Sequence, residues 1–218
     1  MPTRIPIRNL EVYGWCDPAA GKKARIRTRS ARQAIIIVAR DWLDRWFELY
    51  HWAGRLTPTQ LKNKVLDVYE KFRPRRFGIE ANGMQILFGS LVQDAAEERF
   101  GRIRMVPIYQ PTNVEKHYRI RTGLEPVIDQ GRLFVQDKTS PLAIEIRGFP
   151  TSATKDLVDG LESVIRFSPK RPEAKNKNRN LERYASYLRS TGCPAHLIAT
   201  KLADFENQNM KGNYHAAS

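Results

Sequence analysis

Acidic residues stand at three places where a predicted strand or helix meets a loop. Asp17 directly follows the first predicted strand, and Glu80 ends the fourth. Asp156 and Asp159 lie in the first turn of the last helix predicted for the core. Because the carboxyl ends of parallel strands form the binding crevice of an open sheet, Asp17 and Glu80 would stand side by side if their strands are parallel neighbours. The last helix would then have to bring Asp156 beside them.

Carboxylates gathered at one place suit metal-dependent hydrolysis. Like charges repel and raise one another's pKa unless a cation intervenes, and Mg²⁺ and Mn²⁺ prefer oxygen ligands. Two such ions about 4 Å apart clamp the attacking and leaving oxygens of a phosphodiester. The alternative is that the residues act separately: Asp17 in a turn, Glu80 in an ion pair at a strand end, and Asp156 as a favourable charge at a helix N-terminus.

The charge balance of the chain favours a polyanionic partner. The 218 residues carry 37 Lys and Arg against 23 Asp and Glu, a formal net charge of +14. Nucleic acid is the commonest polyanion that such a surplus serves, and a generally basic soluble protein is the alternative. The 2 cysteines lie far apart and the 4 histidines lack ligand spacing, so we expect neither a disulfide framework nor a zinc site. No stretch approaches the roughly 20 apolar residues of a membrane span.

The order of predicted elements indicates how these carboxylates are positioned. Hydrophobic periodicity, helix caps and turn residues predict the strands, helices and loops. The N-terminal half reads as strands at 10–15, 34–39 and 46–52 joined by short turns, a helix at 57–72, a strand at 77–80, a helix from 84 to 100 with Met84, Leu87, Leu91 and Ala95 on one face, and a strand at 103–109. This order is typical of an α/β, RNase H-like mixed sheet: an antiparallel meander extended by parallel βαβ strands and flanked by helices. The order alone does not exclude another α/β domain.

The C-terminal half contains mainly helices. We predict helices at 112–124, 140–147 and 155–167, a hairpin strand at 131–136, and two short helices at 181–189 and 194–205. Residues 168–180 are rich in proline, lysine and asparagine, a composition typical of a solvated linker. We therefore expect a nuclease domain at 1–169 and a basic linker with a helical tail at 170–218.

Six short segments resemble, in order, the nuclease domain of phage large terminase subunits. They are 13–19 (YGWCDPA), 54–58 (GRLTP), 78–85 (GIEANGMQ), 116–120 (KHYRI), 131–134 (GRLF), and Phe149-Pro150 followed by 155–159 (KDLVD). The resemblance covers roughly residues 10–167. It departs from the family at Lys155, where many members have the first of two adjacent aspartates, and in the arginine-rich stretch between the first two strands, where many have a further aspartate.

The resemblance implies which residues carry the reaction. It assigns Asp17, Glu80 and Asp156 as catalytic residues, and the same three with Asp159 as ligands of two Mg²⁺ or Mn²⁺ ions. Lys22, Lys23, Lys116, Arg119 and Arg121 are the expected contacts to DNA. Lys116 and Arg119 lie one helical turn apart, so both could face phosphates, although a solvated face is the alternative.

The function implied is cleavage of double-stranded DNA with little sequence specificity during phage genome packaging. The implied partners are double-stranded DNA, a terminase ATPase domain or subunit, a portal ring and a small terminase subunit, in the host cell cytoplasm, with no membrane and no place in the mature virion. The stretch 19–23 is not a phosphate-binding loop, so we expect an isolated or separately encoded nuclease domain. The alternatives are a nuclease resembling Holliday-junction resolvases and a catalytically silent module that docks on DNA or a portal.

Overall fold

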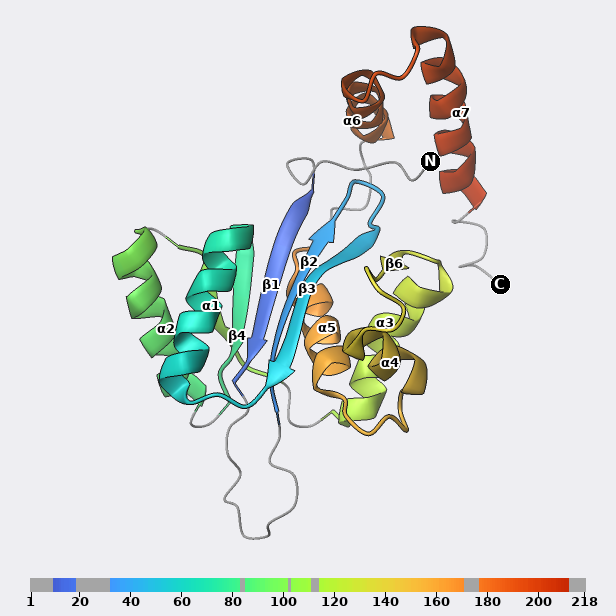
Figure 1. Cartoon of the computed structure of the whole chain (residues 1–218). Helices are drawn as coiled ribbons and strands as arrows, with labels where there is room; N and C mark the ends of the chain where they lie inside the picture. The colour runs from blue at the N-terminus through green and yellow to red at the C-terminus, as the bar shows by residue number, and fades with distance from the viewer. Residues whose placement is uncertain are drawn as a thin grey trace. The chain divides into compact units, whose positions relative to one another are not determined.

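A mixed β-sheet forms the centre of the first of two compact units, Met1–Pro169 and Lys170–Ser218 (Figure 1). The computed structural model describes residues 10–18, 32–82, 85–101, 103–110, 114–170 and 177–211, with the backbone alone at 177–180 and 206–211. Within these residues the sheet has the strand order β5-β4-β1-β2-β3-β6. The strands are β1 (Glu11–Asp17), β2 (Gln33–Arg40), β3 (Trp46–Gly54), β4 (Arg76–Glu80), β5 (Met105–Ile108) and β6 (Leu133–Phe134).

The pairing pattern confirms the predicted meander with parallel extensions. β1, β2 and β3 are antiparallel, whereas β4 pairs parallel to β1 and β5 parallel to β4. All side chains from Ala34 to Ala39 are fully buried, as the unbroken apolar run predicted for a strand covered on both faces. The expectation of short turns throughout the meander is wrong, because β1 ends at Asp17 and β2 begins only at Gln33.

The predicted hairpin strand at 131–136 is also wrong in its pairing. Only Leu133 and Phe134 form a strand, β6, and it runs parallel to β3 rather than beside a hairpin partner. The backbone N–H of Trp46 donates to the carbonyl of Arg132 over 2.7 Å. The exposed edge of β3 therefore supplies the partner, which local turn signals do not reveal.

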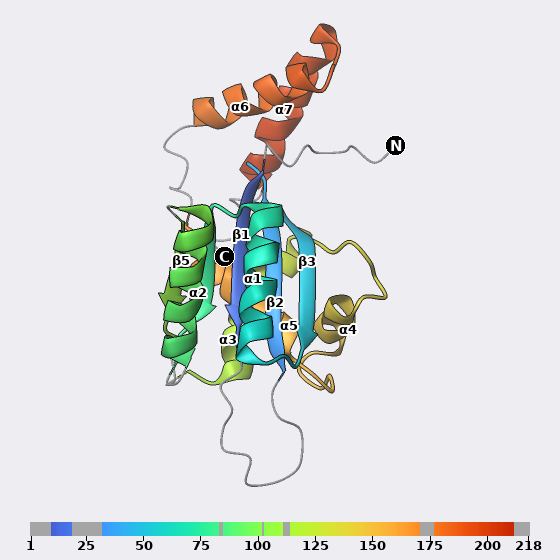
Figure 2. The same cartoon turned by 60° about the vertical axis from the view of Figure 1, so that its left-hand side comes forward.

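Helices cover the two faces of the sheet (Figures 1 and 2). The first face carries α1 (Pro58–Phe72) and α2 (Gln85–Phe100), and the second carries α3 (Lys116–Asp129), α4 (Pro141–Gly148) and α5 (Asp156–Phe167). Successive residues of a strand point to opposite faces. Accordingly Val12 and Cys16 pack with the α1 and α2 side, whereas Tyr13 and Trp15 pack with α5. By the same alternation, Asp17 points to the face of Tyr13 and Trp15, which α5 covers.

The helix ends follow their local signals, but the face of α2 does not. Thr57 caps α1 in a capping box with Gln60, as predicted. In α2, by contrast, Leu87 is 74% exposed and Leu91 46% exposed. The buried residues are Gln85, Gly89, Val92 and Ala96. Apolar residues occur on every side of α2, so hydrophobic periodicity predicted the wrong buried face. Met84, which was predicted to lie on that face, is outside the described residues.

The side chain of Glu115 sets the start of α3, and the sequence analysis did not identify it as a helix cap. Both carboxylate oxygens of Glu115 accept backbone N–H groups, from His117 at 3.0 Å and Tyr118 at 2.7 Å. This cap places the first helical residue at Lys116 rather than Thr112, and the helix continues past the expected end at Leu124.

The second unit contains α6 (Lys177–Ser190) and α7 (Ala195–Lys211), both longer than the predicted segments. The ring of Tyr184 stacks on that of Phe205 with centroids 4.8 Å apart. Ala185 and Leu188 are buried with Phe205. Among the described helices of the chain, none combines the length and apolar character that crossing a bilayer demands.

Candidate active site

Asp17 and Glu80 lie at the same end of two neighbouring parallel strands. The register pairs Cys16 of β1 with Ile79 of β4, and both strands end one residue later. Alternation directs Asp17 to the face of Tyr13 and Trp15, and directs Glu80 to the opposite side from Ile79, which packs with α1 and α2. Both carboxylates thus belong to the face covered by α5, as the strand-end argument predicted.

Glu80 is a largely buried carboxyl group with acidic and basic neighbours. Burial raises the pKa of Glu80 to about 8, with further upward contributions from the negative charges of Asp17 and then Asp159. Lys116 and Arg119 oppose this rise without cancelling it. Burial is the largest cause, so Glu80 favours its protonated form more than an exposed carboxyl group does, and the charges of Asp17 and Asp159 add to this preference.

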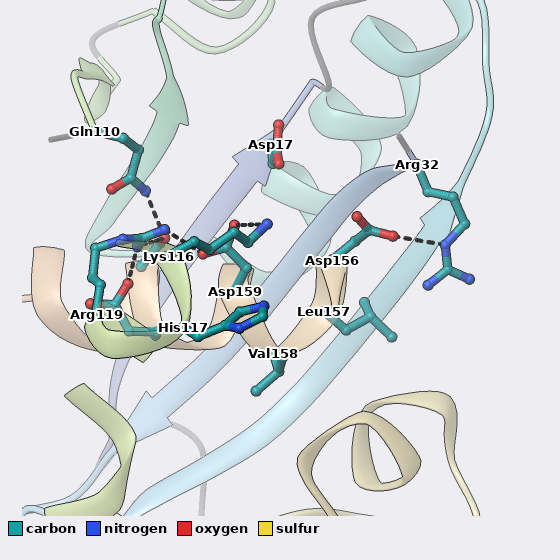
Figure 3. Close-up of polar contacts among 12 residues, drawn as sticks. Asp17, Arg32, Gln110, Lys116, His117, Arg119, Asp156, Leu157, Val158 and Asp159 are labelled. Atoms are coloured by element: carbon teal, nitrogen blue, oxygen red, sulfur yellow. Dashed lines mark hydrogen bonds and ion pairs between the residues drawn. The ribbon is translucent and has the colours of Figure 1, made fainter. Parts of the chain in front are cut away.

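Helix α5 contributes Asp159 from the turn that faces the two strands. Asp159 is only 6% exposed. One of its oxygens accepts Lys116 Nζ at 2.7 Å, and the other accepts Arg119 at 2.5 Å (Figure 3). Burial lowers the pKa of Lys116, but the negative charges of Asp159, Asp17 and Asp156 together raise it by more. The positively charged side chain of Lys116, from α3, thus lies among the acidic groups.

Asp156 has a different environment. Its Oδ2 accepts the Arg32 Nε–H at 2.9 Å, and Figure 3 shows its carboxylate turned toward Arg32. Asp159, by contrast, is among the groups that raise the pKa of Glu80. The sequence predicts Asp156 as a catalytic residue and both α5 aspartates as metal ligands, and these roles remain predictions.

A buried polar network holds Arg119 beside Asp159. Glu162, 1% exposed, accepts hydrogen bonds from both Arg119 and Arg166, the latter at 2.7 Å. Gln110 receives a hydrogen bond from Arg166 and donates to Ser163 Oγ at 2.7 Å. Sequence reasoning missed these groups, because in the sequence they look like ordinary polar positions of an amphipathic helix and a loop.

Two further missed residues support the ends of the strands. The Gln85 amide donates to Asp17 Oδ1 at 3.4 Å and accepts the Asn82 backbone N–H at 3.1 Å. The Asn82 side chain accepts the backbone N–H of Gln110 at 3.0 Å. The loop after β4 is thus tied both to Asp17 and to the segment after β5. Polar side chains directly after buried strands were the signal that would have found them.

The donor set is chemically suited to a hard divalent cation. Asp17, Glu80 and Asp159 offer only carboxylate oxygens, which Mg²⁺ and Mn²⁺ prefer, and their mutual repulsion is what such a cation relieves. In the described part of the chain no three carboxylate, imidazole or thiolate groups converge closely enough to share one ion. The ion pairs of Asp156 with Arg32 and of Asp159 with Lys116 and Arg119 turn both α5 aspartates toward protein cations instead.

The residues expected to bind DNA occupy unlike positions. Lys22 and Lys23 lie outside the described residues. Lys116 and Arg119 both pair with Asp159, with 46% and 10% of their side chains exposed, and their contact with DNA phosphates remains a prediction. Arg121 is exposed on α3 and lines a groove with Ile146 and Phe149.

The sheet order and the covering helices define an RNase H-like fold, and comparison with solved structures supports this assignment. The nuclease domain of the phage P22 large terminase superimposes with a TM-score of 0.53 and 17% sequence identity, over 76% of this chain and 85% of that one. The terminase resemblance predicted from the short motifs is therefore confirmed at the level of structure.

Other solved structures match less closely. The large terminase nuclease of the thermophilic phage G20c gives a TM-score of 0.49 at 11% identity, over 74% of this chain and 84% of that one. Thermus thermophilus RuvC in complex with a Holliday junction substrate gives 0.43 at 12% identity, over 81% and 96%. No protein-family model and no curated protein sequence matches the chain. At these identities the similarity concerns the fold.

Proposed function

We propose that this chain is a metal-dependent endonuclease that cleaves double-stranded DNA with little sequence preference, as the nuclease step of phage genome packaging requires. The observation that carries the proposal is the juxtaposition of Asp17 and Glu80 at the ends of adjacent parallel strands, with Asp159 close enough to raise the pKa of Glu80. The basic balance of the chain suits a polyanionic substrate.

The roles follow from the positions of the side chains. Asp17, Glu80 and Asp159 would hold the divalent cations, and Asp156 is a further ligand candidate. Bound Mg²⁺ or Mn²⁺ supplies activation of water and neutralisation of the charge that develops on the phosphate. Gln85 orients Asp17, and the network around Glu162 holds Arg119 against Asp159. Contacts to phosphates carry no base readout, so cleavage should depend little on sequence.

The test is plasmid digestion with three variants of the full chain. The parent should nick or linearise plasmid in Mn²⁺ or Mg²⁺ and not in EDTA. Asp17→Asn and Glu80→Gln should each lower the rate at least about 100-fold, the scale on which electrostatic groups act in catalysis. Asp67→Asn, which alters an exposed ion pair on α1, is the matched control and should cut normally. Cutting that persists in chelator, or that survives both site substitutions, would exclude this mechanism.

A nuclease for branched DNA is the second candidate, and an exposed apolar surface favours it. Ile86, Leu87 and Leu91 of α2 are 39%, 74% and 46% exposed. A resolvase cuts two strands symmetrically and so needs two sites in one dimer, for which such a face offers a contact. Comparison of linear and four-way junction substrates, with the mass of the chain in solution, distinguishes the two. A monomer that digests linear duplex supports the terminase-like function.

The remaining partners extend the same proposal. A terminase ATPase, a portal ring and a small terminase subunit, met in the cytoplasm of an infected host, are the partners that a packaging nuclease would need. If the parent chain binds duplex but no divalent ion and never cuts it, the silent docking module is the better description.

A further inference from the structure

The two aspartates in the first turn of α5 are held by cations from different parts of the fold. Asp159 pairs with Lys116 and Arg119 of α3, whereas Asp156 pairs with Arg32, directly before β2 (Figure 3). The side chains of Asp156 and Arg32 are 20% and 25% exposed, so their ion pair lies at the rim of the site rather than in the core.

Arg32 is anchored independently of Asp156. Its Nη2 donates to Glu145 Oε1 at 2.8 Å, while its Nε donates to Asp156 at 2.9 Å. Glu145 has a 3% exposed side chain, and its other oxygen accepts the backbone N–H groups of Leu157 and Val158 at 2.8 and 3.0 Å. Because Glu145 is committed to the start of α5, it keeps the guanidinium in place even when Asp156 leaves.

The bond between Arg32 and Asp156 is therefore the replaceable one. Asp156 and Asp159 stand three residues apart in the first turn of α5, so their side chains lie on the same face of the helix, and Asp159 is the one that pairs with Lys116 and Arg119. A rotation of its side chain away from Arg32 breaks one ion pair and leaves α5, its cap and Glu145 unchanged. A partly exposed ion pair contributes little to stability, so coordination of a divalent cation by Asp156 can replace it.

We propose that Arg32 is a latch that keeps Asp156 outside the carboxylate cluster, and that release of this latch adds Asp156 to the ligands of a divalent cation. This inference rests on the proposed metal site at Asp17, Glu80 and Asp159. It assigns Arg32 as a positioning residue that sets metal affinity, with Glu145 as its fixed anchor. While Arg32 holds Asp156, the site thus offers a divalent cation one carboxylate ligand fewer.

Calorimetric titration of Mn²⁺ into the full chain tests the latch without relying on cleavage. Arg32→Gln removes the ion pair and should tighten Mn²⁺ binding about tenfold, because one more carboxylate becomes available and one neighbouring positive charge is lost. Arg99→Gln makes the same change of charge at an exposed ion pair between α1 and α2, and should leave the affinity unchanged. Circular dichroism and thermal melts verify that each variant is folded.

A double-mutant cycle separates release of Asp156 from the simple loss of a positive charge. On an Asp156→Asn background, Arg32→Gln should no longer tighten binding, since the ligand that the latch withholds is gone. If Arg32→Gln fails to fold, Arg32→Lys replaces it in the cycle: lysine keeps the charge but cannot bridge both carboxylates, so a smaller gain that depends on Asp156 is expected.

The outcomes distinguish the latch from the site on which it rests. Unchanged or weaker Mn²⁺ binding in Arg32→Gln, or a gain that persists on the Asp156→Asn background, overturns the latch. In either case loss of Mn²⁺ binding in Asp17→Asn would still support the metal site. Absence of Mn²⁺ binding in the parent chain overturns both proposals.

Discussion

Glu80 carries the strongest electrostatic signature among the candidate site residues. Its pKa is raised to about 8 by burial and by Asp17 and Asp159, although Lys116 and Arg119 lie nearby. A buried carboxylate with like-charged neighbours costs stability whenever it is ionised, and structures retain such an arrangement where function needs it. The neighbouring carboxylates have partners of their own, since Gln85 donates to Asp17 and Arg119 pairs with Asp159.

This signature predicts a pH dependence for the metal-free protein. The folded-state pKa lies above the ordinary value of 4.5, so the folded state binds the Glu80 proton more tightly than the unfolded state does. The free energy of unfolding should therefore fall as pH rises from about 4.5 to about 8, and then level off. We expect a loss of about 2 kcal/mol after allowance for partial solvent exposure.

Urea denaturation in EDTA at several pH values measures this loss. Glu80→Gln should flatten the dependence and raise stability at pH 8, while saturating Mn²⁺ should flatten it in the parent because a cation replaces the proton. Glu125→Gln, at an exposed position of α3, serves as control. A parent whose stability stays constant from pH 5 to pH 8 would contradict the assignment of an electrostatically strained Glu80.

At the scale of elements, α5 is the helix that completes the site, and its start is fixed from another helix. Its N-cap, Lys155, makes no side-chain capping bond. Glu145 of α4 supplies the missing acceptor for the backbone N–H groups of Leu157 and Val158. The carboxylate also complements the positive end of the helix dipole. The orientation of Asp156 and Asp159 thus depends on a residue outside α5.

Replacement of Glu145 should therefore weaken both the fold and the site. Glu145→Ala leaves two buried backbone donors without their acceptor and Arg32 without one of its two carboxylate partners, and we expect about 2–4 kcal/mol of lost stability in urea denaturation. Glu145→Gln keeps an oxygen acceptor and should lose roughly half as much. An exposed residue of the same helix, Arg147→Ala, should cost under about 0.5 kcal/mol. Equal effects of Glu145→Ala and Arg147→Ala would show that this external cap is unimportant.

Sequence patterns predicted the elements whose causes are local. The capping box of Thr57 and Gln60 and the buried apolar run of β2 depend on residues that are neighbours in the chain, so their locations were predictable. The buried face of α2 and the parallel pairing of β6 depend on distant partners, and both predictions were wrong. The same division applies to the candidate site: strand ends bring Asp17 and Glu80 to one edge of the sheet, whereas the ion partners of Asp156 and Asp159 come from distant residues, Arg32, Lys116 and Arg119.

At the scale of the whole molecule, the basic surplus should govern binding to DNA. The formal charge is +14, and each neutralised phosphate of a duplex releases counterions, so log K should fall with log salt by about 0.9 per contact. Arg121→Ala should lower this slope by about one contact. Lys71→Ala, on α1 across the sheet, is the matched control and should not change it.

Fluorescence anisotropy on two unrelated duplexes, in a metal-free buffer, measures these slopes. Similar affinities for both duplexes are expected, because phosphates are the same in every sequence. A flat salt response or a strong preference for one duplex would favour a protein that reads bases.

The division into two units predicts the effect of truncation. The first unit ends at Pro169, and its carbonyl accepts a hydrogen bond from the buried Arg40 at 2.9 Å. A chain that stops after Lys170 should remain soluble and melt within about 4 °C of the full chain, since that shift corresponds to about 1 kcal/mol. We expect residues 170–218 to contact DNA or a protein partner instead. Aggregation or loss of the cooperative melt on truncation would show that the tail contributes to the core.

The separation of the site residues along the chain affects when nuclease competence arises during synthesis. Asp17 comes from the first strand of the sheet and Asp159 from the last helix of the first unit, so the site brings together the two ends of that unit. Contacts between such distant residues form late in folding, because closing the intervening chain costs entropy. A polypeptide translated only as far as α4 holds Asp17 and Glu80 without either aspartate of α5. On the proposed function, unfinished or misfolded copies would be harmless to nucleic acid around the ribosome, and only a completely folded copy would acquire the ability to cut.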